Sequence, residues 1–342
     1  MLLITLRSLR PKYIYQQQFM TKPTGVICIG EILIDLLSNE PDVNWKKVKS
    51  WTPYTGGAPA NVAFALASLG LNVAFAGRIG ADSVGFQLHH ELKEAGIDTQ
   101  GIQIDSSAPT RQVFVERNKS GERFFAGFGK YHSTAFADTK FDASQIPAGL
   151  FDNYNCLLIG TLLLPYSHSK AAIYRAVELA KEKGILLAID INWRPVFWNN
   201  VDEAPLEIKS LMKEMDLIKL SEEEATWLFD TRDPKIIASE FPNARVVLVS
   251  KGEEGCNYYI NSVSGTCPSF RVNVVDTTGA GDSFMAGFLH QYLTSNMIGT
   301  ATEVHRWVQF ACAIGALCTA VPGAISAKTT VAKAKEFLNM HT

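Results

Sequence analysis

The segment with the most specific chemistry runs Asp276-Thr277-Thr278-Gly279-Ala280-Gly281-Asp282. It joins a predicted strand, residues 270–275, to a predicted helix, residues 282–293. Small residues let the backbone approach a ligand closely, and the free N–H groups and dipole at a helix start favour an anion. The segment therefore predicts a phosphate cradle formed by Gly279, Ala280 and Gly281.

Asp282 stands where the helix should begin, and two interpretations of it are open. Asp is common as the capping residue of a helix. A carboxylate beside a bound phosphate is costly, however, and phosphoryl transfer to a hydroxyl needs a carboxylate that accepts the hydroxyl proton. The second interpretation joins cradle and base in one segment, as a kinase requires.

Other phosphate-binding motifs are absent from the sequence. There is no G-x-x-x-x-G-K-[ST] segment, which excludes a P-loop enzyme. The protein-kinase segments H-R-D and D-F-G are missing too. Gly279 and Gly281 resemble part of a dinucleotide fingerprint, but Met285 lies nearest to the place of its third glycine and the segment comes late in the chain.

A second glycine-rich segment, Gly56-Gly57-Ala58-Pro59-Ala60-Asn61, opens a predicted helix. Its glycines would bring the main chain close to a ligand, and Asn61 offers both a donor and an acceptor to a polyol. Asp35 follows a predicted buried strand, 26–34. Taken singly, Asn61 and Asp35 are each explained better by a loop or turn than by ligand binding.

Apolar runs alternate with helical patterns along most of the chain, which predicts a mostly parallel sheet covered by helices on both faces. The strands are expected at 26–34, 73–79, 156–159, 186–191, 217–220, 245–250 and 270–275. The helices are expected at 60–69, 84–95, 170–183, 282–293, 303–319 and 330–340. Short polar residues follow the strand ends, where open α/β sheets bind ligands. They are Asp35, Gly160, Asp190, Asn192, Lys219, Ser250 and Asp276.

Two segments break this alternation and predict a small β-sheet that projects from the α/β body. Residues 45–51 mix lysines with large apolar residues, as edge strands do. Residues 111–117 and 122–128 flank Asn118-Lys119-Ser120-Gly121, which is typical of a hairpin. We expect this sheet, from about 36–55 and 102–130, to form a lid on a single domain covering residues 26–342.

Composition excludes several classes of protein. The net charge of -2 gives no basic face for nucleic acid or an anionic membrane. No segment has the roughly 18–20 apolar residues of a membrane span. The six cysteines form no C-x-x-C pair, which predicts a reducing compartment and no structural zinc. The histidines show no ligand spacing, and we expect none to be catalytic.

Residues 1–25 differ from the rest because they contain four basic residues and no acidic one. They are either a transit-like presequence, which would imply import into an organelle, or the product of an upstream start codon, with Met20 as the true beginning. The low serine content favours the second interpretation, and with it a cytoplasmic location.

Two motifs resemble the signatures of the ribokinase/PfkB family of carbohydrate kinases. The first is Gly56-Gly57-Ala58-Pro59-Ala60-Asn61-Val62-Ala63, followed by Gly70 and Gly80, and the second is the segment 276–282. Within this family the chain looks most like fructokinases, through Gly30-Glu31-Ile32-Leu33-Ile34-Asp35, Asp190-Ile191-Asn192-Trp193-Arg194 and Lys219-Leu220-Ser221-Glu222-Glu223-Glu224. The resemblance implies a ribokinase-like three-layer α/β/α fold and ATP-dependent phosphorylation of a sugar, with fructose as the expected acceptor.

The resemblance also implies roles for single residues. Asp282 would be the base, with Gly279, Ala280 and Gly281 as the anion hole. The sugar would be held by Asp35, Gly56, Gly57 and Asn61. ATP would contact Asn192, Ser250, Lys251, Gly252, Gly255, Gly279, Gly281 and Gly323. Mg²⁺ would be organised through water by Asn192 and Glu224, and K⁺ by Asp276 and Thr278. A homodimer through the lid is a further expectation.

The chain departs from the family pattern at two positions. Ser221 replaces the usual Asn of an N-x-x-E motif, and Ser221 with Glu224 makes a capping box that explains Glu224 without magnesium. Cys312 stands where fructokinases usually place an Asn near adenine. We expect Arg194, which follows a strand end, to contact an anion.

The acceptor is not fixed by these motifs. 2-Keto-3-deoxygluconate, ribose or a nucleoside are alternatives to fructose, and Arg111 in the lid is a candidate partner for the carboxylate of an acidic sugar. A catalytically silent family member that acts as a binding protein is a further alternative. Loss of the cradle or base would favour it, and both are present.

Overall fold

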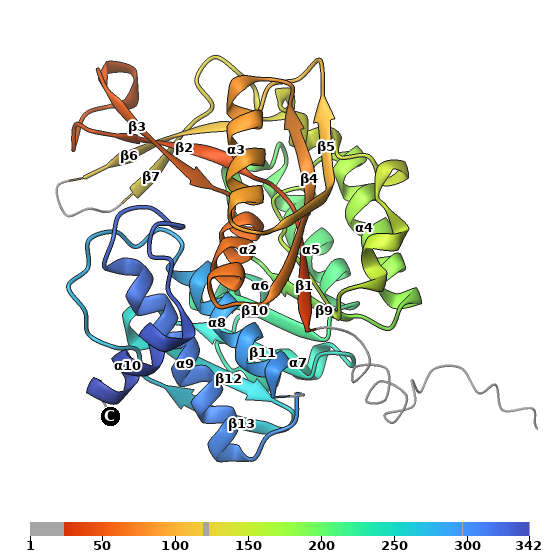
Figure 1. The fold of residues 1–342 in the computed structure, drawn as a ribbon, viewed down its shortest axis with the longest axis vertical. Coiled ribbons are helices and arrows are strands. Elements are labelled where there is room, and N and C mark those ends of the chain that lie inside the picture. Colours follow the sequence, from red (N-terminus) through yellow and green to blue (C-terminus); the bar gives the residue numbers. More distant parts are fainter. Residues whose placement is uncertain (1–23, 119–122, 296, 342) are drawn as a thin grey trace, which may run out of the picture.

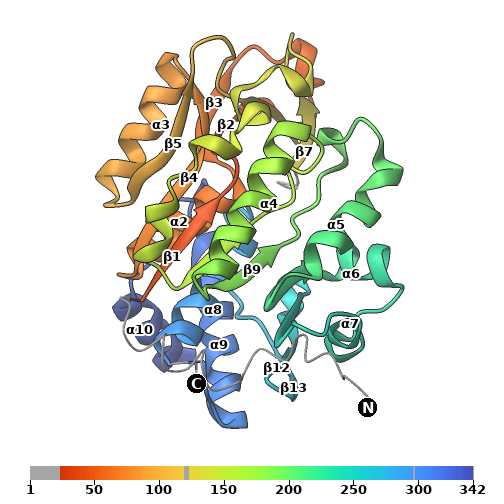
Figure 2. The same cartoon turned by 90° about the vertical axis from the view of Figure 1, so that its right-hand side faces the viewer.

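The computed structural model describes residues 24–118, 123–295 and 297–341, which form two sheets (Figures 1 and 2). The larger sheet has the strand order β13-β12-β11-β10-β9-β8-β1-β4-β5. Its strands are β1 Gly25–Ile29, β4 Asn72–Gly80, β5 Asp98–Asp105, β8 Cys156–Ile159, β9 Leu186–Asp190, β10 Leu217–Ser221, β11 Val246–Ser250, β12 Cys256–Ile260 and β13 Val263–Cys267. Most of the expected N-terminal extension, residues 1–23, and the hairpin turn at 119–122 lie outside the described residues.

Both faces of the central part of the large sheet are buried, because alternate side chains of its central strands enter two separate cores. In β1, Ile27 and Ile29 enter one core, and Val26 and Cys28 enter the other. The first core is covered by α4 Ser167–Glu182, α5 Ala204–Met212, α6 Glu222–Phe229 and α7 Pro234–Glu240. The second is covered by α2 Ala58–Ser68, α3 Ser83–Glu94, α8 Ala280–Thr294, α9 Ala301–Thr319 and α10 Val331–His341. This confirms the predicted three-layer α/β/α fold.

The strand order reverses around β1, and this places the site. Strands β11, β10, β9, β8, β1, β4 and β5 are parallel, and β1 pairs with β8 on one side and with β4 on the other. Ligands bind beyond the carboxyl ends of strands at such a reversal. The antiparallel pair β12 and β13 completes one edge of the sheet, and the sequence patterns did not predict it.

The smaller sheet has the order β3-β2-β6-β7 and projects from the body beside the carboxyl end of β1 (Figure 1). Its strands are β2 Leu33–Ser38, β3 Trp51–Gly56, β6 Gln112–Arg117 and β7 Arg123–Gly127. The predicted hairpin is confirmed, since β6 and β7 pair antiparallel. The expected bounds were too wide at 102–130, because residues up to Asp105 belong to β5 of the large sheet.

Three predicted strands differ in the structure. The run 26–34 is two strands, broken where the N–H of Gly30 bonds to the carbonyl of Ala76. Residues 45–51 are not an edge strand: Trp45–Lys47 is a 3-10 turn, and β3 begins only at Trp51. Residues 270–275 form no strand, because the N–H groups of Val275 and Asp276 bond to the carbonyl of Thr319 at the end of α9.

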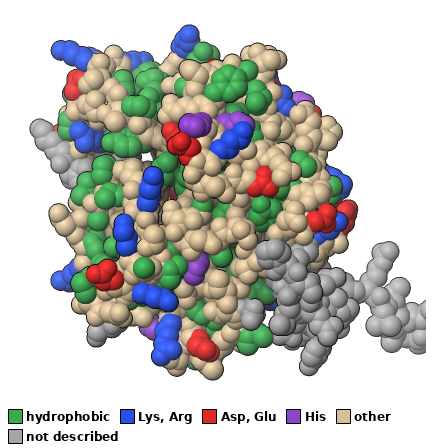
Figure 3. Space-filling model, in the orientation of Figure 1, with side chains coloured by type: hydrophobic (Ala, Val, Ile, Leu, Met, Phe, Trp, Pro, Cys, Tyr) green, Lys and Arg blue, Asp and Glu red, His purple; other side chains and the backbone are tan. Residues whose placement is uncertain are grey.

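The surface carries acidic and basic side chains interspersed on the face seen in Figure 3. In the part of the chain that the structure describes, no helix is both long and apolar enough to cross a membrane.

Candidate active site

A cavity of about 490 Å³ lies between the carboxyl ends of the central strands, the starts of α2 and α8, and the small sheet. It brings together many residues that the sequence predicted. Those on its wall are Asp35, Gly57, Asn61, Asn192, Arg194, Thr278, Gly279, Gly281 and Asp282. The small sheet contributes Val115 of β6 and Phe125 of β7 to the same wall. The cavity therefore joins both glycine segments, which are more than 200 residues apart in the sequence.

Asp282 lies in the first turn of α8, but it does not cap the helix. The capping position is Gly279, with φ of 74°, and no side chain caps this helix. The carboxylate of Asp282 instead accepts a hydrogen bond from Nδ2 of Asn61, at 2.8 Å. The capping interpretation of Asp282 is therefore wrong, and its carboxylate is directed at the cavity.

The environment of Asp282 tunes its proton affinity. Burial raises the pKa of Asp282 to about 6, and the charge of Asp190 acts in the same direction. Lys219, the hydrogen bond from Asn61 and the charge of Arg194 oppose this rise. A carboxylate with a pKa near 6 is a better proton acceptor than an ordinary Asp and is still ionised at neutral pH.

This pKa predicts how activity depends on pH. The base works only when it is deprotonated, so kcat/KM for the acceptor should fall about tenfold per pH unit below about pH 6 and level off above it. Because the cation of Arg194 lowers the pKa of Asp282, Arg194→Met should move this inflection to higher pH. Initial rates between pH 5 and 8 at saturating nucleotide measure both profiles. If the inflection stays at the same pH in Arg194→Met, the titrating group is the nucleotide and not Asp282.

The predicted phosphate loop, residues 276–282, is shaped by its glycines. Gly279 has a positive φ, and a Cβ on it would overlap the side chain of Ala324. A Cβ on Gly281 would come within 3.2 Å of Nζ of Lys219. The ammonium of Lys219 thus lies against the loop, where it adds a positive charge to the uncapped start of α8.

Lys219 and Asp190 form a buried ion pair at the floor of this region. Nζ of Lys219 donates to Oδ2 of Asp190 at 2.7 Å, and both side chains are more than 90% buried. Oδ1 of Asp190 is buried and has no hydrogen-bond partner among the described residues. Sequence reasoning placed both residues at strand ends but gave them no role. The signal was a charged residue in each of two mainly apolar strands, Asp190 at the end of β9 and Lys219 in the middle of β10.

The second glycine segment holds the sugar-binding candidates in place. Gly57 has φ of 101°, a conformation that favours glycine, and it caps α2, whose first turn carries Asn61. Gly56 pairs with Leu33 across β2 and β3, and a Cβ on it would overlap the carboxylate of Asp35. Gly56 does not itself line the cavity, but its missing side chain leaves room for Asp35.

Glu224 has the structural role that the capping box predicted. Its Oε2 accepts from the N–H of Ser221 at 2.8 Å, and the hydroxyl of Ser221 accepts from the N–H of Glu224. Its Oε1 accepts from the N–H of Trp193 at 2.7 Å. Glu224 thereby fixes the turn that carries Asn192, whose φ is 39°. It does not line the cavity, so any contact with a metal would run through water.

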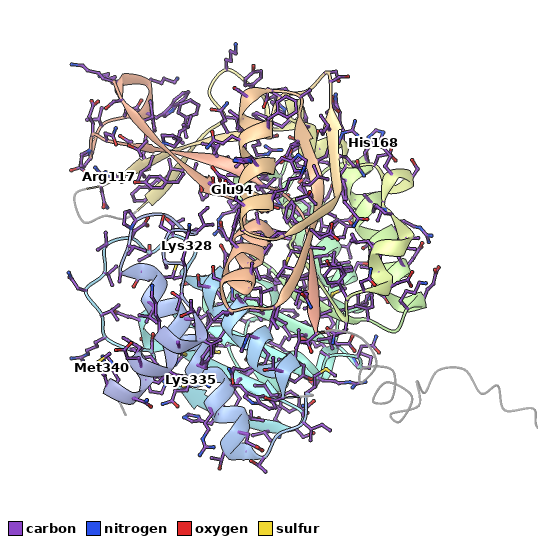
Figure 4. The ribbon with its side chains drawn as sticks, viewed as in Figure 1. Glu94, Arg117, His168, Lys328, Lys335 and Met340 are labelled. Carbon is purple, nitrogen blue, oxygen red and sulfur yellow. The ribbon has the colours of Figure 1, made fainter. Side chains whose placement is uncertain are left out.

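The remaining nucleotide and cation candidates lie outside the cavity wall. Asp276 accepts from the N–H of Thr278 and from the N–H of Gly323, which ties the phosphate loop to the loop after α9. A Cβ on Gly323 would come within 2.7 Å of Tyr54 in β3, so this loop also touches the small sheet. Lys328 lies in the connection between α9 and α10, and Arg117 lies at the end of β6 in the small sheet (Figure 4).

The predicted nucleotide loop follows β11, beside β10 in the large sheet. Ser250 pairs with Ser221 at the carboxyl ends of the two strands. Lys251, Gly252 and Gly255 form the turn into β12, where Gly252 and Gly255 both have positive φ. Ala280 begins α8 next to the cavity without lining it.

Arg111 is not available to a substrate carboxylate, and this corrects the expectation from the sequence. Its Nε and Nη2 donate to the two oxygens of Asp138 at 2.6 and 2.7 Å, and its side chain is fully buried. Nη2 also donates to the carbonyl of Ser133. The partner stands 27 residues away in the sequence, where no local pattern could reveal it.

A carboxylate with a raised pKa, an uncapped helix start rich in glycine and a buried lysine meet at the edge of a parallel sheet. This combination defines a phosphotransferase site of the kind that acts on a hydroxyl group. Residues 23–331 match the model of the pfkB family of carbohydrate kinases. The chain belongs to this family, and it is an ATP-dependent carbohydrate kinase.

Relatives and solved structures agree with this family. The chain is 34% identical over 317 residues to fructokinase-2 of Solanum lycopersicum, an alignment that covers 92% of this chain and 95% of the relative. A fructokinase from Xylella fastidiosa with bound ATP is similar with a TM-score of 0.82 and 27% identity, over 93% of this chain and 98% of that one. A double mutant of Vibrio cholerae fructokinase with bound fructose, ADP and potassium ion gives a TM-score of 0.78 and 25% identity, over 93% and 99%.

Proposed function

We propose that the protein is a fructokinase that transfers the γ-phosphoryl group of ATP to a hydroxyl of D-fructose and forms fructose 6-phosphate. The observation that carries the proposal is the Asn61–Asp282 hydrogen bond, because it joins the base to a sugar-binding candidate within one cavity. The similarity to fructokinases over nearly the whole chain supports fructose as the acceptor.

The residues of the cavity have separate roles in the proposed reaction. Asp282 accepts the proton of the attacking hydroxyl, and Asn61 holds the carboxylate in position. The N–H groups at the start of α8 and the ammonium of Lys219 stabilise the negative charge of the transferring group. Arg194 lines the same cavity, and its guanidinium lies 5.7 Å from the ring centroid of Phe125 in β7 of the small sheet.

Two cations fit the oxygen-rich surroundings of the site. Asp190 keeps one buried oxygen without a hydrogen-bond partner among the described residues, which suits a water-mediated Mg²⁺ site with Asn192 and Glu224. Mg²⁺ would neutralise phosphate charge when bound with ATP. Asp276 and Thr278, in the loop that Asp276 ties to Gly323, are the candidates for K⁺.

The charges of the cavity favour a neutral acceptor over an acidic sugar. Asp35 of β2 and Asp282 of α8 line it. Arg111, the candidate partner for a sugar carboxylate, is paired with Asp138. A 2-keto-3-deoxygluconate carboxylate would therefore meet the carboxylates of Asp35 and Asp282 and could not pair with Arg111.

The acceptor is tested by initial rates of ADP release with ATP, Mg²⁺ and K⁺. We expect kcat/KM for fructose to exceed that for glucose, ribose, 2-keto-3-deoxygluconate and adenosine. Parallel reactions without K⁺, and with Mg²⁺ chelated, test the two cations, and we expect both to lower the rate. A higher kcat/KM with another acceptor would contradict fructose as the substrate, and no turnover with any acceptor would favour a silent family member.

We also propose that the small sheet closes over the bound sugar and contributes to a homodimer. Lid closure would exclude water and limit wasteful hydrolysis of ATP. Phe124 and Phe125 of the edge strand β7 are 45% and 44% exposed, and burial of such side chains would favour association. Gel filtration with light scattering should give twice the monomer mass of 37.6 kDa, and elution as a monomer would contradict the dimer.

A further inference from the structure

Glu31 is a buried acid on the cavity wall that sequence reasoning did not identify. It lies in the short connection between β1 and β2, and it is only 1% exposed. Its Oε1 accepts from the N–H of Ala58 at 2.9 Å, at the start of α2. Its Oε2 is buried and has no hydrogen-bond partner among the described residues.

An unpartnered buried carboxylate oxygen is costly, and a group that lines a ligand cavity can recover this cost when the ligand supplies a donor. The link to Ala58 alone would need just one acceptor oxygen, which a neutral side chain could provide. Burial raises the pKa of Glu31 to about 8, and the charges of Asp138 and Asp282 add to the effect. Without a ligand the carboxyl group is therefore largely protonated at neutral pH, and a hydroxyl that donates to Oε2 would favour its ionised form, which Gln cannot adopt.

A second acceptor in the same cavity is also unpartnered. Nδ2 of Asn61 donates to Asp282, but Oδ1 of Asn61 is buried without a hydrogen-bond partner among the described residues. Glu31 is connected to this residue through α2, because the helix that Glu31 anchors at Ala58 carries Asn61 one turn later. Two residues that line one cavity thus each have a buried acceptor oxygen without a partner among the described residues, which suits the neighbouring hydroxyl donors of a polyol.

We propose that Glu31 is a sugar-binding residue, and that its Oε2 accepts a hydrogen bond from an acceptor hydroxyl next to the one held by Asn61. This inference rests on the proposed function and deepens it, because it assigns a residue that selects an uncharged polyol. The same carboxyl group positions the start of α2 through Ala58, so one side chain both binds the sugar and positions the helix.

The test measures binding and turnover separately. Fructose binding is measured by calorimetry in the presence of a non-hydrolysable ATP analogue, for wild type and Glu31→Gln. The amide can still accept from Ala58 through its oxygen, but its NH2 group cannot accept a sugar hydroxyl. We expect Kd and KM for fructose to rise about 10- to 100-fold, with KM for ATP and the melting temperature little changed. Glu94→Gln, at the exposed end of α3 (Figure 4), is the matched control and should bind as wild type.

Deoxy sugars identify the hydroxyl involved. The deoxyfructose that lacks the hydroxyl bound by Glu31 should bind wild type and Glu31→Gln equally weakly. Every other deoxyfructose should bind Glu31→Gln more weakly than wild type, by the same factor as fructose does. Unchanged fructose binding by Glu31→Gln would overturn the inference while leaving fructokinase activity intact. An equal loss for ATP and sugar together with a lower melting temperature would also overturn it, since that pattern belongs to a structural role. Wild-type protein that neither binds nor turns over fructose would contradict the proposed function itself.

Discussion

Asp282→Asn should lower kcat by roughly 10² to 10⁴-fold and leave KM for the sugar little changed. The amide has nearly the shape of the carboxylate, so the cavity should keep its form, but it cannot accept the proton of the attacking hydroxyl. The hydrogen bond from Asn61 at 2.8 Å can be preserved through the amide oxygen of the variant. The loss should therefore appear in the chemical step, measured by single-turnover formation of ADP.

Asp233→Asn provides the matched control for this change. Asp233 caps α7 at the surface, where its side chain accepts from the N–H of Lys235, and Asn caps a helix about as well as Asp. Turnover of this variant should equal that of wild type. Near-full turnover by Asp282→Asn would remove Asp282 as the base.

Lys219→Met should have the second large effect, on activity and on stability. It removes the cation beside Gly281, which should lower kcat by about 10² to 10³-fold, as the loss of a charge-stabilising donor does. It also leaves the buried carboxylate of Asp190 without its ion-pair partner at 2.7 Å, which should cost about 3–5 kcal/mol of the free energy of unfolding. Urea unfolding and initial rates measure the two losses.

A double variant separates the two roles of Lys219. Lys219→Met combined with Asp190→Leu removes both charges, so much of the stability should return while activity stays low. Lys170→Met is the surface control, because the Lys170–Glu207 pair is about one-third exposed and should contribute less than about 1 kcal/mol. Restored turnover in the double variant would show that Lys219 matters only for folding.

The sequence predicted best those features whose residues lie close together in the chain. The apolar strands alternating with helices predicted the parallel sheet, because strands buried on both faces read as continuous apolar runs. The loop from Asp276 to Asp282 predicted the start of a helix at a ligand site, and the structure places the start of α8 beside the cavity. The capping box of Ser221 and Glu224 was confirmed because both partners lie within one helical turn.

The features that the sequence could not predict depend on distant partners. Residues 270–275 have the pattern of a strand, but their end is bonded to Thr319, and nothing local indicates this. Arg111 appeared available until the structure placed Asp138 beside it. Glu31 stood unnoticed between two strands, and only its burial and its bond to Ala58 show its importance.

The most direct test of the account is the fate of the γ-phosphoryl group when purified protein is incubated with ATP, Mg²⁺ and fructose. Release of ADP and formation of phosphorylated fructose are measured together by mass spectrometry, with and without the sugar. We expect one fructose 6-phosphate for each ADP and little ADP without fructose, because the bound sugar supplies the hydroxyl that Asp282 deprotonates. ADP release at the same rate without fructose, or with no phosphorylated sugar, would contradict phosphoryl transfer to fructose.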